Sequence, residues 1–375
     1  MQLGRFIAPP GLFRLSLAFV VFVSHCTRLE LGSAAVYLFF MLSGFWVRQM
    51  WSKEYAPTTA PYRTFIISRL WRLLPVHYIA LLMLIPLQYF LWGGILPMAG
   101  WPEIHFALSH VFLLGYATLA GALQLNPVVW SLDIELQFYL LAPLLIILLS
   151  RYPWFSLPRL ALYGFALGGL AVFVTCYGTH FNTGFLPMYL AFFLIGLHSA
   201  HFGWKPRKAI AVGALATAIA LIAGCVMLPA TRAILLTPDL AQPVASLLAY
   251  NSYANIILAL LLSAYAIATV RKVPVKGTWL AKIDRDLSNI TYEVYLLHTT
   301  VLSVMFRFAS TFSKHDRVLV TILAWFASML LSFIVYRLFD RPIDRLRIAY
   351  VRSRRRALPP TPVLDRTERA LPMAV

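Results

Sequence analysis

The sequence predicts an all-α, polytopic membrane protein with about ten transmembrane helices, both termini in the cytoplasm and one re-entrant or interfacial segment near residues 105–122. Of its 375 residues, 60% are apolar and 12% are charged, whereas soluble domains carry about 25% charged residues. The mean hydropathy is +0.75, and many apolar stretches approach the roughly 20 residues that a membrane-crossing helix needs. Together these observations argue against a soluble domain.

Proline, glycine and charge clusters divide the chain into ten apolar spans. We expect helices at 12–27, 33–50, 73–92, 130–150, 160–178, 185–203, 208–228, 248–270, 287–308 and 317–338. One further apolar stretch, 105–122, contains two histidines and has no Lys or Arg at either end. We interpret it as re-entrant or lying on the membrane surface, because counting it as a span would invert every helix that follows.

The basic residues support this topology. With the N-terminus in the cytoplasm, 27 of the 32 Lys and Arg residues fall in cytoplasmic segments, as the positive-inside rule requires. The exceptions are Arg28, Arg232, Arg307, Lys314 and Arg317. This distribution accounts for the net charge of +18 without a nucleic-acid partner, and membrane lipids are the predicted surroundings.

We expect one membrane domain over residues 1–345 and a basic, Pro-rich, unstructured cytoplasmic tail over residues 346–375. Cys26, Cys176 and Cys225 fall in separate apolar segments, which favours neither a disulfide framework nor a thiolate metal site. No other set of ligands stands out, so no metal is predicted.

Ionisable side chains at membrane depth are costly and therefore candidates for function. In the first span, Arg14 and His25 are eleven positions apart, which corresponds to about 16 Å along a helix and nearly three full turns. Arg14 should lie near the cytoplasmic side and His25 near the outer side, on the same face. Alternatively, His25 has no catalytic role, and its side chain simply extends from the helix end into the membrane–water interface.

Arg69 and Arg72 lie three residues apart, on one helical face just before an apolar run. Two guanidinium groups at this spacing suit phosphate oxygens, although a topology signal that contacts lipid headgroups explains them equally. Asp133 and Glu135 begin a later span at the outer membrane boundary, between Trp130 and Tyr139, which occupy positions typical of interfacial aromatic residues. A carboxylate there would orient an imidazole acting as general base, whereas helix capping is the simpler alternative.

In "LSNITYEVYLLHTTV", Tyr292, Tyr295 and His298 recur every three residues and form a polar stripe on an apolar helix. Such a stripe indicates either a site or hydrogen bonding between helices. In their order, these stretches resemble the acyltransferase 3 family of integral membrane acyltransferases, which modify bacterial surface glycans. The resemblance runs to about residue 345 and rests on "FRLSLAFVVFVSH", "VYLFFMLSGFWV", "RLWR", "WSLDIELQFYLLAPLL" and "YEVYLLH".

The resemblance implies a ten-helix fold in the bacterial inner membrane, with acyl-CoA, most simply acetyl-CoA, as the cytoplasmic donor. His25 would be the catalytic base, and Arg69 and Arg72 would contact the CoA phosphates, with Arg14 and Glu135 needed for activity. The acceptor would be a surface glycan or a lipid-linked saccharide. Asp133 and Leu136 stand where the family often has Ser and a second Glu, which indicates a specialised acceptor side.

Within this hypothesis, Glu135 or Asp133 orients His25. The candidates to contact the substrate or to stabilise the thioester oxygen are Ser43, Trp130, Tyr295 and His298. An acyl-enzyme at Cys26 or at His25 is an alternative to direct transfer. Rival functions are a transporter or flippase for an anionic or lipid-linked substrate, and an assembly subunit of an export complex. The sequence leaves the acceptor sugar and the oligomeric state open.

Overall fold

A computed structural model describes residues 3–92, 102–116, 125–152, 184–228, 231–236, 244–272, 274–275, 277–308 and 313–355, together with four single positions between 162 and 169. Regular structure in these ranges is helical. The elements are η1 (Leu3–Phe6), α1 (Pro10–Cys26), α2 (Gly32–Met50), η2 (Trp51–Tyr55), α3 (Pro61–Trp92), α4 (Pro102–Phe112), α6 (Trp130–Arg151), η4 (Leu186–Met188), α8 (Leu190–His201), α9 (Lys208–Met227), α10 (Arg232–Leu235), α11 (Val244–Leu261), α12 (Ser263–Arg271), α13 (Trp279–Phe308), α14 (Lys314–Val335), η7 (Tyr336–Asp340) and α15 (Arg341–Ser353).

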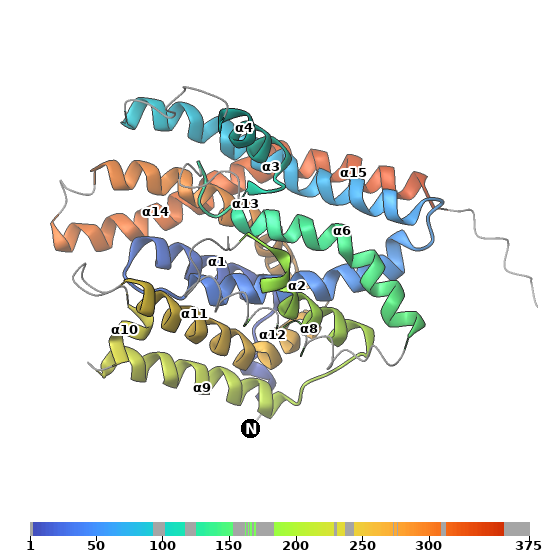
Figure 1. Ribbon diagram of the computed structural model, residues 1–375, viewed down its shortest axis with the longest axis horizontal. Coiled ribbons are helices and arrows are strands. Elements are labelled where there is room, and N and C mark those ends of the chain that lie inside the picture. The colour runs from blue at the N-terminus through green and yellow to red at the C-terminus, as the bar shows by residue number, and fades with distance from the viewer. Residues whose placement is uncertain are drawn as a thin grey trace, which may run out of the picture.

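The helices form a bundle whose long axes run roughly side by side, with α4 at one edge and α9 at the other (Figure 1). Helix α2 packs against α8 and α1, and α1 packs against α13, which also contacts α3 and α14. Fully buried side chains such as Phe45, Phe138 and Phe193 fill the centre. The outer helices expose large apolar side chains instead, including Ile219 of α9 and Phe326 of α14, as expected for helices that face lipid.

Among the described residues, four helices are long and apolar enough to cross a membrane: Pro61–Leu91, Trp130–Arg151, Lys208–Met227 and Asp316–Ser353. A pair bent by 42°, Tyr253–Leu261 with Ser263–Arg271, is a fifth candidate. The all-helical, membrane-type architecture is therefore as predicted. Ten spans and two cytoplasmic termini stay predictions, and the span expected at 160–178 lies almost wholly outside the described residues.

Two helices begin earlier than the sequence predicted. Helix α3 begins at Pro61 rather than near residue 73, with Pro75 and Pro86 inside it, and α13 begins at Trp279 rather than near 287. Each internal proline removes one backbone hydrogen bond, but Leu73 and Val76 on either side of Pro75 are buried, and this packing keeps the helix continuous. Arg69 and Arg72 consequently lie within α3, on a helix as their spacing predicted.

The segment predicted to be re-entrant or interfacial begins with α4, which has 11 residues and is too short to span a bilayer. The chain then turns at Leu113 and Gly115, both of which have positive φ angles. Leu113 and Tyr116 are fully buried, so the turn enters the bundle. Residues 117–124 of this segment lie outside the described residues.

Helix α14 continues through the π-helical turn η7 into α15. Helix α15 lies beside α3 (Figure 1), and Thr58 forms an isolated bridge with Arg355. The domain boundary predicted at residue 345 therefore falls inside α15, and residues 346–353, which we expected to be unstructured, are helical. Residues 356–375 lie outside the described residues.

Candidate functional site

A cavity of about 330 Å³ lies inside the bundle, lined by residues of α1, α2, α3, α6, α13 and α15. Its charged lining residues are Arg14, Arg69, Arg72, Arg347 and Glu135. Four guanidinium groups thus face one carboxylate in a partly enclosed space. Positive charge that is removed from water in this way is stabilised by an anionic ligand.

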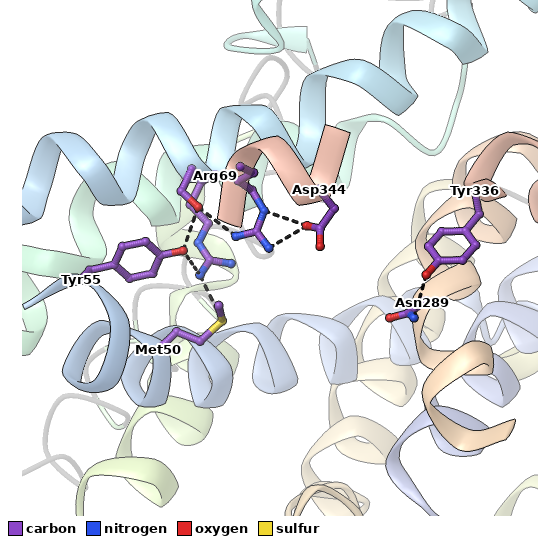
Figure 2. Close-up of polar contacts among 8 residues, drawn as sticks. Met50, Tyr55, Arg69, Asn289, Tyr336 and Asp344 are labelled. Carbon is purple, nitrogen blue, oxygen red and sulfur yellow. Dashed lines mark hydrogen bonds and ion pairs between the residues drawn. The ribbon is translucent and has the colours of Figure 1, made fainter. Parts of the chain in front are cut away.

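Arg69 is held by its neighbours on α2, η2 and α6. Only 4% of it is exposed, and its guanidinium lies 5.4 Å from the centre of the Tyr139 ring and 5.5 Å from that of Tyr55. Its Nη2 donates to the Tyr55 hydroxyl at 3.2 Å and contacts Met50 Sδ at 3.3 Å, and Figure 2 shows these contacts. The aromatic rings fix the plane of the guanidinium.

Arg14 and Arg72 reach the cavity from α1 and α3. Arg14 Nη1 donates to Ser288 Oγ of α13 at 3.1 Å, while its buried Nε has no hydrogen-bond partner among the described residues. Arg72 lines this cavity and also a second one of about 220 Å³. The structure therefore brings together the three arginines that the sequence singled out as candidates for function.

Glu135 is tied to two hydroxyl groups. Ser43 Oγ and Tyr139 OH each donate to Glu135 Oε1 at 2.6 Å. These charge-assisted hydrogen bonds fix the carboxylate beside the arginines. Of the residues predicted to contact substrate, Ser43 and Tyr295 line the same cavity.

His25 lies outside the lining of this cavity. It is the penultimate residue of α1 and is solvent-exposed, and its ring centre lies 5.5 Å from that of the fully buried His298. His298 is in turn 6.4 Å from the ring of Tyr295, whose hydroxyl hydrogen-bonds with Ser131 at 2.7 Å. Two rings, those of Tyr295 and His298, therefore lead from the cavity wall to His25.

Asp133 and Glu135, the two carboxylates predicted to orient His25, point in different directions. Asp133 Oδ1 accepts from the Gly115 amide at 3.2 Å and from Gln137 Nε2 at 2.9 Å, away from the cavity that Glu135 lines. Residues two apart on a helix do not share a face. The structure records no hydrogen bond from His25 to either carboxylate in the described ranges, so its orientation by them stays a prediction.

Trp130, the remaining substrate candidate, packs into an aromatic group rather than into the cavity lining. Its ring centre lies 5.4 Å from that of Tyr189 and 6.2 Å from that of Phe40. Both rings belong to the main buried core. The described contacts of Trp130 are therefore packing contacts.

The second cavity is almost wholly polar and lies between α3, α13, η7 and α15. Glu293 lines it and is fully buried, with no hydrogen-bond partner for either carboxylate oxygen among the described residues. Asn289, one turn before Glu293 on α13, donates from Nδ2 to Tyr336 OH at 2.9 Å (Figure 2). In the described part of the chain, no three His, Cys, Asp or Glu residues are placed to hold a metal ion, and the absence of a metal stays a prediction.

Two features of the site were missed from the sequence. Tyr139 was read as an interfacial aromatic residue, although it holds Glu135 and covers Arg69. Arg347 was assigned to the tail, although it lines the cavity. The Asp344 and Arg347 pair, at a helical spacing of three, was one sequence signal that indicated an ordered helix there, and the proline in its first turn was another.

Comparison with protein families gives one match, and it covers most of the chain. The family model for an acyltransferase domain, that of the acyltransferase 3 family, matches residues 3–337. Comparisons with the curated proteins and with the solved structures gave no match. The family match includes every residue that the sequence predicted for the site, and the chain belongs to the acyltransferase 3 family of membrane acyltransferases.

Proposed function

We propose that this chain transfers an acyl group, most simply acetyl, from cytoplasmic acetyl-CoA to a hydroxyl of a cell-surface or lipid-linked glycan at the outer side of the bacterial inner membrane. The observation that carries the proposal is the convergence of Arg14, Arg69, Arg72 and Arg347 on one cavity. In an acyltransferase, the donor that brings several phosphate charges to such a cavity is acyl-CoA.

The phosphates fit the end of the cavity near Arg69 and Arg72, because guanidinium groups bind phosphate oxygens through paired hydrogen bonds. The uncharged pantetheine arm then follows the lining residues of α2 towards Ser131 and Tyr295. This path points the thioester towards the ring contacts that lead to His25.

At the outer end, His25 takes the proton of the acceptor hydroxyl as its oxygen attacks the thioester carbonyl carbon. The new C–O bond forms, the C–S bond breaks, and the CoA thiolate takes up a proton and leaves as the thiol. Tyr295 and His298 are the candidates to donate a hydrogen bond to the carbonyl oxygen in the transition state, whereas the single Ser43 hydroxyl proton is donated to Glu135. Glu135, fixed by Ser43 and Tyr139, balances part of the positive charge of the cavity.

The test of this function measures base-labile acetate on surface polysaccharide. We expect acetate to be lost in a deletion strain, restored by the wild-type chain and not restored by His25→Ala. Cys26→Ala is the matched control, since Cys26 is the next residue of α1 but projects about 100° away on a helix, and it should restore acetate. Equal acetate in all four strains would contradict an acetyltransferase function for that polymer.

The rival function, transport of an anionic or lipid-linked substrate, makes a different prediction for purified protein in lipid vesicles. A transporter takes up its substrate without consuming acetyl-CoA, whereas the proposed enzyme releases CoA and depends on His25 for that release. Uptake without CoA release would favour the transporter.

A further inference from the structure

Helix α15 carries a buried arginine that the family match, which ends at residue 337, does not include. We propose that Arg347 is a phosphate-binding residue of the donor site, so that α15 completes this site rather than serving as a tail. The inference rests on the proposed function, because it takes the anionic ligand to be acyl-CoA.

Arg347 is held in place but keeps hydrogen-bond donors free. It is 8% exposed; its Nε and Nη2 contact Asp344 Oδ1 at 2.8 and 2.7 Å, and its Nη1 donates to Ser68 Oγ at 3.0 Å. A guanidinium has five N–H groups, so two remain without an acceptor among the described residues. Because Arg347 lines the cavity, a ligand there can reach it.

Hydrogen bonds connect Arg347 to Arg69. Ser68 Oγ, which accepts from Arg347, also hydrogen-bonds with Tyr55 OH at 2.9 Å, and Tyr55 OH accepts from Arg69 Nη2 at 3.2 Å. Figure 2 shows the Tyr55 hydroxyl hydrogen-bonded to Arg69 on one side of this group, and Asp344, which pairs with Arg347, on the other side. Two guanidinium groups, from α3 and from α15, are thus fixed relative to each other by two buried hydroxyl groups.

The charge balance favours an anion over a purely structural ion pair. Asp344 neutralises Arg347 in part and is itself 35% exposed, so the ion pair is partly screened. Arg14, Arg69 and Arg72 remain against Glu135 in the lining of this cavity, and Arg72 also faces Glu293 and Asp340 in the second cavity. Even when Arg72 is assigned to those acids and Glu135 and Asp344 are both counted, one positive charge is left over in the first cavity, which an anionic ligand would stabilise.

The alternative is that Arg347 only fastens α15 to α3. Comparing two acyl donors distinguishes these roles, because acetyl-pantetheine carries the same thioester as acetyl-CoA but lacks its pyrophosphate and nucleotide. A phosphate contact affects acetyl-CoA alone, whereas a structural contact affects both donors.

The experiment measures thiol release by the purified full-length protein in lipid vesicles, with de-O-acetylated polysaccharide as acceptor, for wild type, Arg347→Gln and Arg352→Gln. We expect Arg347→Gln to raise the KM for acetyl-CoA by about 10- to 100-fold, the range for a hydrogen bond to a charged group, with kcat nearly unchanged. With acetyl-pantetheine, Arg347→Gln and wild type should behave alike. Arg352→Gln removes the same charge from an exposed position on the same helix, and it should match wild type with both donors.

Equal losses of thiol release with both donors, or an unchanged KM for acetyl-CoA, would overturn the role of Arg347 while leaving the proposed function intact. Absence of acetyl-CoA turnover by the wild type would overturn both. If Arg347→Gln does not fold, Arg347→Lys makes the same comparison, because it keeps the charge but loses the planar fork. A smaller rise in KM that is confined to acetyl-CoA is then expected, and no rise overturns the inference.

Discussion

Helices α2 and α8 approach so closely that two of their glycines have no room for a side chain. A Cβ built on Gly196 would lie 1.8 Å from the Met41 carbonyl oxygen, and one on Gly44 would lie 2.1 Å from that of Phe193. We therefore predict that Gly196→Ala forces the two helices apart.

The size of the effect follows from these distances. Ordinary contact begins at 3.4 Å, so the two backbones have to separate locally by about 1.6 Å. Overpacking typically costs 1–3 kcal/mol, and we expect about 3 kcal/mol because the clash is with backbone. At roughly 2–4 °C per kcal/mol, Tm falls by about 6–12 °C. Ser43, which lies on α2 beside Gly44, would lose its 2.6 Å hydrogen bond to Glu135, so turnover should fall as well.

The assay is thermal unfolding in detergent, with Gly213→Ala as the matched control. Gly213 lies in α9, and a Cβ there meets nothing within 4 Å, so Ala should leave Tm unchanged or raise it slightly through its higher helix propensity. Equal Tm values for Gly196→Ala and Gly213→Ala would refute the close approach of α2 and α8.

Three further predictions concern the site. Tyr139→Phe removes one of the two hydrogen bonds to Glu135 and should reduce kcat/KM about tenfold, as expected for a hydrogen bond to a charged group; an unchanged steady-state rate would argue against a role for this carboxylate. Arg14→Gln should raise the KM for acetyl-CoA, whereas a lower kcat at unchanged KM would place Arg14 beside a protein carboxylate rather than the donor. Cys26→Ala should keep nearly full thiol release, and its loss in a well-folded protein would favour an acyl-enzyme at Cys26.

Several helices could be predicted from the sequence because a polar or charged residue bounds a single apolar run. The spans expected at 130–150 and 208–228 match α6 and α9 to within one residue at each end. Hydrophobicity alone does not show how far a helix extends beyond its apolar run into polar sequence. This is why α3 begins twelve residues before the predicted span and why α15 was assigned to the tail.

The individual residues of the site could be predicted from the sequence, but not which of them lie together in the folded chain. Buried arginines are costly in a membrane, so Arg14, Arg69 and Arg72 stood out, and they share a cavity. The role of Arg347 depends on α15 lying against α3, a contact between residues almost 280 positions apart. No local pattern in the sequence contains that information.

Donor binding and proton removal are proposed to occur at separate places, the arginine-lined cavity and His25. The decisive comparison is between wild type and His25→Ala in lipid vesicles that contain acetyl-CoA and de-O-acetylated polysaccharide. We expect His25→Ala to bind acetyl-CoA with wild-type affinity but to release CoA only at the background rate. Wild-type CoA release by His25→Ala would rule out His25 as the group that takes the proton.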